Sequence, residues 1–75
     1  MEDREIWSFK KNAEETVRVS LTEYKGHKLL DLRVYVEAQT GQQIPTRKGL
    51  CLSRDLARDL FEGLKRAVEI VEGKL

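Results

Sequence analysis

With 75 residues and 8.7 kDa, the chain has room for a single domain, residues 1–75, and its one cysteine and one histidine exclude an internal disulfide and a four-ligand Cys/His zinc site. A hydrophobic fraction of 40%, a charged fraction of 36% with both signs mixed and a net charge of +1 exclude a disordered chain and a membrane-embedded one. A compact monomer of this size would bury only about 60% of its unfolded surface, so we expect oligomerisation to supplement the small core.

Four short segments have the patterns of β-strands. The run Ile6–Phe9 is apolar and aromatic, and apolar residues alternate with polar ones over Val17–Tyr24 and again over Leu30–Glu37. The turn signal Lys25–His27 lies between the two alternating runs, so they are predicted to form a hairpin. The short apolar run Leu50–Leu52 is predicted to be the last strand.

A helix is predicted to follow these strands, from the N-cap Ser53 to the stop signal Gly73. Its apolar residues cover about 180° of the helix circumference, whereas an ordinary surface helix needs an apolar stripe only about 100° wide. We therefore expect an α+β fold, β-β-β-β-α, whose helix covers its own sheet and also contacts a second chain. The residues predicted to lie in this dimer interface are Leu60, Leu64, Val68 and Val71.

No arrangement of residues predicts catalysis. We expect Cys51, inside an apolar run, to be buried and His27, in a turn, to be exposed, and their spacing does not support a nucleophile–base pair. The common glycine-rich phosphate-binding motifs are absent from the sequence. We therefore expect a protein that is not an enzyme and that needs no cofactor or metal.

The charge is divided unevenly along the chain. Residues 1–17 carry a net charge of −2, residues 18–48 carry +3, and residues 49–75 are balanced. The polar side of the predicted hairpin carries arginines, hydroxyls and tyrosines, and such a face suits single-stranded nucleic acid because cations follow phosphates and flat rings accept unstacked bases. A polar outer face is also usual for any antiparallel sheet, so this pattern alone leaves a merely solvated face as the alternative.

The motifs of the chain lie in two segments, Val17-Arg-Val-Ser-Leu-Thr-Glu-Tyr-Lys-Gly-His-Lys-Leu-Leu-Asp-Leu-Arg33 and Pro45-Thr-Arg-Lys-Gly-Leu-Cys-Leu-Ser53. With these motifs, residues 16–70 closely resemble the transcriptional coactivator p15 (positive cofactor 4, PC4) family. The resemblance implies a curved four-stranded antiparallel sheet followed by one helix, a homodimer, and binding to single-stranded or melted DNA. The serine- and lysine-rich tail of eukaryotic members is absent, so the chain resembles a stand-alone, bacterial-type member.

The resemblance also implies roles for individual residues. Tyr24 stands at the family's base-stacking aromatic, Lys25 at the phosphate-contacting lysine after it, and Arg33 at the arginine of the long strand. Arg47 and Lys48 match the basic pair before the final strand. With two further strand-face cations, the predicted nucleic-acid-binding residues are Tyr24, Lys25, Lys28, Arg33, Arg47, Lys48 and Arg18.

The chain departs from the family pattern at three positions. Val36 stands where the family has a tryptophan, Ile44 replaces a lysine before the proline, and His27 replaces a lysine in the hairpin turn. One stacking ring is therefore missing. The candidates to replace it are Trp7, Phe9 and Tyr35.

These observations predict a protein that binds single-stranded or melted DNA with little sequence preference and acts as a transcription coactivator-like regulator or repair accessory. Its expected partners are DNA, a second copy of itself, and RNA polymerase or transcription factors. Two alternatives stay open: an RNA-binding module, and a protein-interaction dimer that recruits transcription machinery. The acidic N-terminus without an apolar signal segment and the unpaired thiol predict a cytoplasmic protein without membrane contact, nucleoid-associated if bacterial.

Overall fold

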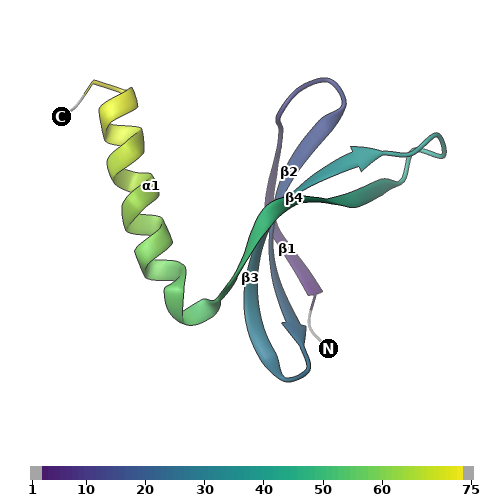
Figure 1. Cartoon of the computed structure of the whole chain (residues 1–75). Helices are drawn as coiled ribbons and strands as arrows, with labels where there is room; N and C mark the ends of the chain where they lie inside the picture. The colour runs from purple at the N-terminus through teal and green to yellow at the C-terminus, as the bar shows by residue number, and fades with distance from the viewer. Residues whose placement is uncertain (1–2, 74–75) are drawn as a thin grey trace.

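The computed structural model describes residues 3–73, which form four strands, a short 3₁₀ turn and one helix (Figure 1). These elements are β1 (Asp3–Lys10), β2 (Glu15–Tyr24), β3 (His27–Glu37), β4 (Gln43–Ser53), η1 (Arg54–Leu56) and α1 (Ala57–Val71). The strands form one antiparallel sheet in the order β1-β2-β3-β4, so β1 and β4 are its edges. The predicted order of four strands followed by a helix is confirmed.

The sheet has one apolar and one polar face, because successive side chains of a strand point to opposite sides. Cross-strand pairs such as Val19 with Leu32 place the apolar residues of β2 and β3 together, and Arg18 pairs with Arg33 on the other side. The apolar face comprises Trp7, Phe9, Val17, Val19, Leu21, Leu30, Leu32, Val34, Val36, Ile44, Leu50 and Leu52. The polar face comprises Thr16, Arg18, Ser20, Thr22, Tyr24, Asp31, Arg33, Tyr35 and Cys51.

The β2–β3 hairpin is closed by the predicted turn. Tyr24 pairs with His27, so the loop consists of Lys25 and Gly26, whose φ angles are 51° and 81°. Two consecutive positive φ angles are typical of the type I′ turn, whose twist matches that of the flanking strands.

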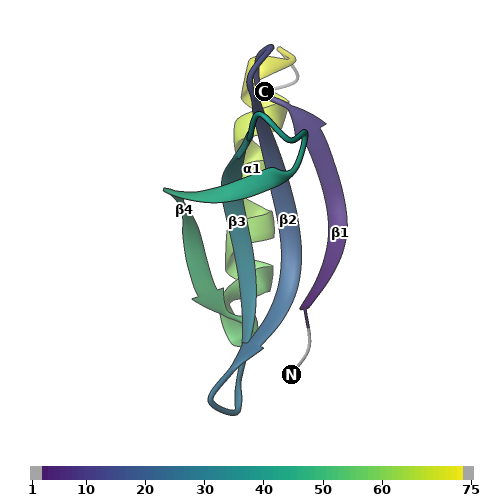
Figure 2. The ribbon, with the colours of Figure 1, turned by 90° about the vertical axis from the view of Figure 1, so that its right-hand side faces the viewer.

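Strand β4 contains a bulge that the sequence pattern did not predict. Gly49 lies opposite Arg33 and Pro45 lies opposite Tyr35, so residues 46–48 together face the single residue Val34. Figure 2 shows β4 bending sharply between its two halves. The predicted strand Leu50–Leu52 is therefore only the end of β4. Because β4 is an edge strand, it tolerates a proline, as expected from the position of Pro45.

The start of the helix differs from the prediction. The Ser53 hydroxyl accepts a hydrogen bond from the Asp55 N–H at 3.3 Å, so it caps η1, whereas α1 begins four residues later at Ala57. The predicted stop is confirmed, because Gly73 has a φ of 75° and its N–H donates to the Ile70 carbonyl at 3.0 Å.

The expectation that the helix covers its own sheet is wrong. Helix α1 packs mainly against η1, which turns the chain away from β4, and Figure 1 shows the helix standing apart from the strands. The wide apolar arc of the helix predicts contacts with other apolar surface, but periodicity does not say which chain provides them. Within the described residues, no apolar side chain is fully buried.

The dimensions of the chain reflect this open arrangement. Its radius of gyration is 14.2 Å, whereas a compact domain of this length is expected to have about 11 Å. Its accessible surface is 6130 Å², whereas a compact monomer is expected to expose about 4,700 Å². The chain therefore exposes about 1,400 Å² more than a compact monomer would.

Candidate nucleic-acid interface

The tip of the β2–β3 hairpin presents an aromatic ring and a cation together. Tyr24 ends β2 with 58% of its surface exposed, and the Lys25 ammonium lies 5.3 Å from the centroid of its ring. Lys28, near the start of β3, is also exposed. This tip has the two groups that commonly bind an unpaired nucleotide. A base can stack on the ring face, and a phosphate can pair with the cation.

The polar face is a layer of internal contacts. The Arg18 guanidinium carbon lies 4.1 Å from the centroid of the Tyr35 ring, and its Nε lies 2.7 Å from a Glu5 carboxylate oxygen. Ser20 is only 3% exposed beside these long side chains. Arg18 is therefore already engaged, and the Tyr35 ring is already stacked, so Tyr35 is a poor replacement for the missing family tryptophan.

Arg33 is engaged in the same layer. Its Nη2 donates to an Asp31 carboxylate oxygen at 2.8 Å and its Nη1 to the Thr46 carbonyl at 3.0 Å. The hydrogen bonds with Asp31 raise the pKa of the Arg33 guanidinium against the opposing effect of burial. Arg33, on β3, thus stabilises the bulge of β4 through its hydrogen bond to the Thr46 carbonyl.

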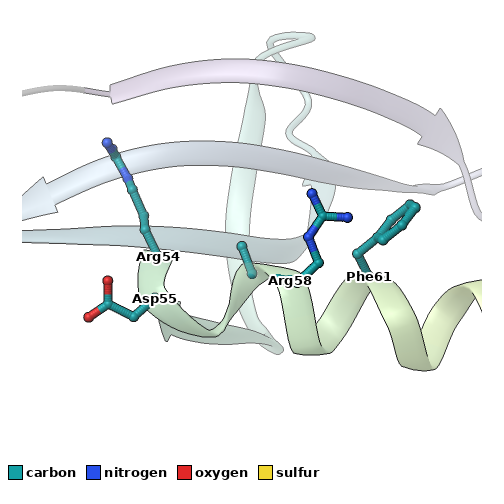
Figure 3. Close-up of a pocket in the computed structure, with 5 residues that line it drawn as sticks. Arg54, Asp55, Arg58 and Phe61 are labelled. Atoms are coloured by element: carbon teal, nitrogen blue, oxygen red, sulfur yellow. The ribbon is translucent and has the colours of Figure 1, made fainter.

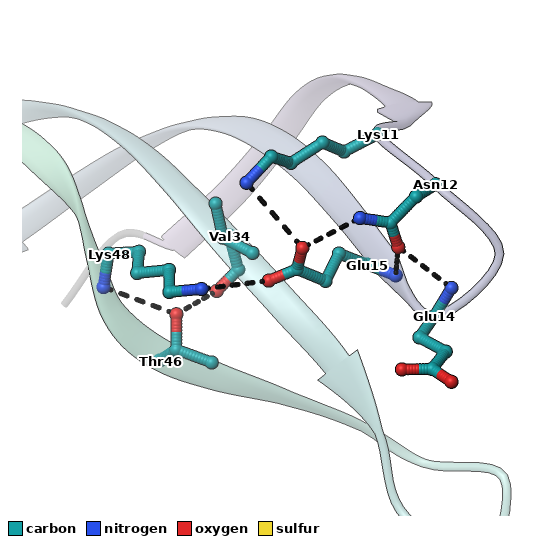
Figure 4. Close-up of polar contacts among 7 residues, drawn as sticks. All are labelled: Lys11, Asn12, Glu14, Glu15, Val34, Thr46 and Lys48. Carbon is teal, nitrogen blue, oxygen red and sulfur yellow. Dashed lines mark hydrogen bonds and ion pairs between the residues drawn. The ribbon is translucent and has the colours of Figure 1, made fainter.

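The bulge of β4 presents the basic pair. The Thr46 hydroxyl donates to the Val34 carbonyl at 2.7 Å and accepts a hydrogen bond from the Lys48 N–H at 3.2 Å (Figure 4). Arg47 is exposed, and Lys48 extends across β3 to β2, where its Nζ lies 3.3 Å from a Glu15 carboxylate oxygen. The bulge therefore directs one cation into solvent and the other over the apolar face.

The predicted nucleic-acid residues do not converge on one cleft. Tyr24, Lys25 and Lys28 lie at the hairpin tip, whereas Arg47 and Lys48 lie at the bulge. The stretch of β3 from His27 to Val34 separates the two groups by about 24 Å at 3.4 Å per residue. This spacing suits an extended polymer better than a small molecule.

Sequence reasoning missed the role of Arg54. Its guanidinium donates to the carbonyls of Leu29 and Thr22, at 3.2 and 3.0 Å, and so ties η1 to the β2–β3 hairpin. In the sequence, Arg54 is one of several charged residues that follow Ser53. No local pattern could have revealed contacts with carbonyls 25 and 32 residues away.

The prediction that Cys51 is buried is wrong, whereas His27 is exposed as expected. Cys51 alternates with Leu50 and Leu52, so it lies on the polar face of an edge strand, opposite Asp31. Residues 3–73 contain no group of three or more His, Cys, Asp or Glu side chains that could hold a metal ion. No helix in the same range is long and apolar enough to cross a membrane.

An open hollow of about 520 Å³ lies at the elbow between η1 and α1 (Figure 3). It is lined by Arg54, Asp55, Ala57, Arg58 and Phe61. The Arg58 guanidinium carbon lies 5.2 Å from the centroid of the Phe61 ring, so the lining is a mixture of apolar and charged surface. It holds no nucleophile with an adjacent base.

The predicted dimer-interface residues lie along one side of α1. Leu64, Val68 and Val71 are exposed, Val71 by as much as 85%, whereas Leu60 is half-buried. Phe61 and Ile70 are exposed on the same helix. The helix therefore has an extensive apolar surface that the described part of the chain leaves uncovered.

Comparison with solved structures shows what the chain resembles. Two crystal forms of BPSL1147, a PC4 homolog from Burkholderia pseudomallei K96243, match with TM-scores of 0.82 and 0.81 and identities of 29% and 28%. These matches cover 88% and 89% of this chain and 89% and 98% of the other. A bacteriophage T5 homolog of the eukaryotic transcription coactivator PC4, 20% identical, matches in fold with a TM-score of 0.77 over 99% of this chain and 85% of its own.

No curated protein sequence matches the chain. The family model described as Transcriptional Coactivator p15 (PC4) matches residues 11–63, which run from the β1–β2 loop into α1 and include the hairpin tip and the bulge. The match and the fold agree, and the chain therefore belongs to the transcriptional coactivator p15 (PC4) family.

Proposed function

We propose that the protein binds single-stranded or melted DNA with little sequence preference, as a homodimer without enzymatic activity, and acts as a transcription coactivator-like regulator or repair accessory. The observation that carries the proposal is the hairpin tip, where the exposed ring of Tyr24 lies beside the Lys25 ammonium in a member of the PC4 family. Stacking on such a ring tolerates any base, because every base has a flat face.

The large exposed surface of the chain, which includes the apolar side of α1, supports the homodimer. The surface of about 1,400 Å² in excess of a compact monomer would bury about 2,800 Å² in total if two copies covered it, which is the size of an obligate interface. The open side of α1, with Leu64 and Val68, and the hollow at the elbow supply such a surface. A second copy of the chain is the occupant that is always present at equal concentration.

The proposed stacking role is tested by fluorescence anisotropy with labelled oligonucleotides of one sequence as single-stranded DNA, duplex DNA and single-stranded RNA. Single strands should bind more tightly than duplex, since a duplex hides the ring faces of its bases. Tyr24→Ala should weaken single-strand binding by about 1–3 kcal/mol, whereas Tyr24→Phe, which keeps the ring, should bind nearly as well as the wild type.

Each other outcome of this experiment identifies an alternative. A preference for RNA over DNA of the same sequence would favour an RNA-binding module. The absence of any salt-sensitive oligonucleotide binding would favour a protein-interaction dimer. If the wild type binds the oligonucleotide and Tyr24→Ala binds it equally well, the hairpin tip is not part of the interface.

A further inference from the structure

The carboxylate of Glu15, the first residue of β2, is held by donors from two distant parts of the chain (Figure 4). From the β1–β2 loop, Asn12 Nδ2 donates to Oε1 at 2.8 Å and Lys11 Nζ lies 3.5 Å from the same oxygen. From the bulge of β4, Lys48 Nζ lies 3.3 Å from Oε2. One negative charge is thus surrounded by two cations and an amide.

The loop side of this arrangement is fixed by backbone contacts. The Asn12 side-chain carbonyl accepts the N–H groups of Glu14 and Glu15 at 2.9 and 2.8 Å, and the Lys11 N–H donates to the Glu15 carbonyl at 2.9 Å. On the other side, the Thr46 hydroxyl accepts the Lys48 backbone N–H and donates to the Val34 carbonyl, which fixes the backbone from which the Lys48 side chain extends. The Asn12 amide and the backbone at Lys11 and Lys48 are therefore held by contacts other than the Glu15 carboxylate.

The same donors suit a phosphodiester. A backbone phosphate carries one negative charge and has two free oxygens, as a carboxylate does, and lysines and side-chain amides are among its usual protein partners. The Lys48 side chain is 67% exposed, so a phosphate in solution can reach it, whereas the Glu15 side chain is only 16% exposed. An exposed lysine that could bind phosphate is therefore neutralised by an internal anion.

We propose that Lys11, Asn12 and Lys48 form a phosphate-binding position for single-stranded nucleic acid, which the Glu15 carboxylate occupies in the free protein and a backbone phosphate takes over on binding. The proposal rests on the proposed function and adds Lys11 and Asn12 to the interface. It also makes Glu15 a residue that lowers affinity. The hydrogen bonds from Asn12 and Lys48 lower the pKa of the Glu15 carboxyl, so the competing charge is present throughout the neutral pH range.

The test compares Glu15→Gln with Glu14→Gln by anisotropy over a series of salt concentrations with a labelled single-stranded DNA. Both variants remove one negative charge at adjacent positions, but within residues 3–73 the Glu14 side chain forms no ion pair. Glu15→Gln should bind about two- to fivefold more tightly, as expected when the ion pairs of two exposed lysines no longer compete, and its slope of log affinity against log salt should be steeper by about 0.7. Equal gains in the two variants, or weaker binding by Glu15→Gln, would overturn the proposal.

Lys11→Ala supplies a second readout. In the Glu15→Gln background it should abolish most of the gain in affinity, whereas in the wild type its effect should be smaller, because Glu15 still competes there. Effects of equal size in both backgrounds would contradict a shared phosphate position. Thermal melting of each variant checks that the fold is retained.

A separate probe distinguishes failure of this proposal from failure of the proposed function. If the wild type binds no oligonucleotide, the proposed function fails. A titration with tripolyphosphate, followed by NMR of the Lys11 and Lys48 side-chain ammonium groups, then tests whether these residues bind phosphate. Glu15→Gln should then respond at lower tripolyphosphate concentration than Glu14→Gln. Identical responses of the two variants would contradict the proposed phosphate-binding position even in that case.

Discussion

Lys25 holds a backbone conformation that few lysines adopt. Its φ of 51° lies in the left-handed region, where residues other than glycine, asparagine and aspartate are disfavoured by about 1–2 kcal/mol. An outlier of this kind at a candidate interface suggests that the side chain is needed there. Under the proposed function the Lys25 ammonium would be needed there, since beside the Tyr24 ring it would bring a phosphate close to a stacked base.

The variant Lys25→Asn should separate stability from binding. Asparagine adopts the left-handed conformation readily, so the free energy of unfolding should rise by about 1 kcal/mol. Loss of one phosphate contact should at the same time make the salt slope of single-strand binding shallower by about 0.7. Urea denaturation and anisotropy measure the two effects, and a variant that loses stability, or that keeps the wild-type slope, would contradict this role for Lys25.

Glu15 should also make stability depend on pH. Its carboxyl pKa in the folded chain lies below the ordinary value of 4.5, so it stabilises the fold above that value and this contribution is lost as the pH falls through the folded pKa. In melting curves recorded from pH 7 downwards, Glu15→Gln should start from a lower melting temperature and lose less on acidification than the wild type. Glu14→Gln should lose as much as the wild type, because its carboxylate has no ion pair to lose within the described residues.

At the scale of elements, alternation of apolar and polar residues was enough to predict β2, β3 and the turn between them. These features are local, since each follows from neighbouring residues and a period of two. The bulge of β4, the orientation of α1 and the Glu15–Lys48 contact were not predictable in this way. Each depends on which distant residues meet, and Thr46, Lys48 and Arg54 carry no local signal of their partners.

Strand β4 lies against β3 closely enough to require glycine at position 49. A Cβ there would lie 2.4 Å from the Leu32 carbonyl oxygen and 2.9 Å from the Arg33 Cα, so one of the two strands would have to move. Gly49→Ala should therefore lower the free energy of unfolding by about 1–3 kcal/mol, as overpacking usually does. Urea denaturation with an unchanged m-value would confirm the loss, and wild-type stability would show that β4 is more loosely held than the structure indicates.

At the scale of the whole molecule, folding and association should be one process. Since no apolar residue within 3–73 is fully buried, the proposed homodimer would supply the core, and the melting temperature should rise with protein concentration. Leu64→Glu should weaken association and folding together, because it places an isolated charge in an apolar contact. Sedimentation equilibrium and melting over a dilution series measure both, and a monomer that melts cooperatively at a concentration-independent temperature would exclude the homodimer.

The open, uncovered helix has a consequence for how such a protein responds to its own abundance. When two chains must meet before either is folded, the amount of folded protein rises with the square of the free chain concentration at low supply. In such a dimer, isolated chains would stay accessible to proteases, which would remove some of them before they find a partner. A modest change in the rate of synthesis should therefore produce a larger change in the amount of folded protein. Below a threshold rate of synthesis, little folded protein would accumulate.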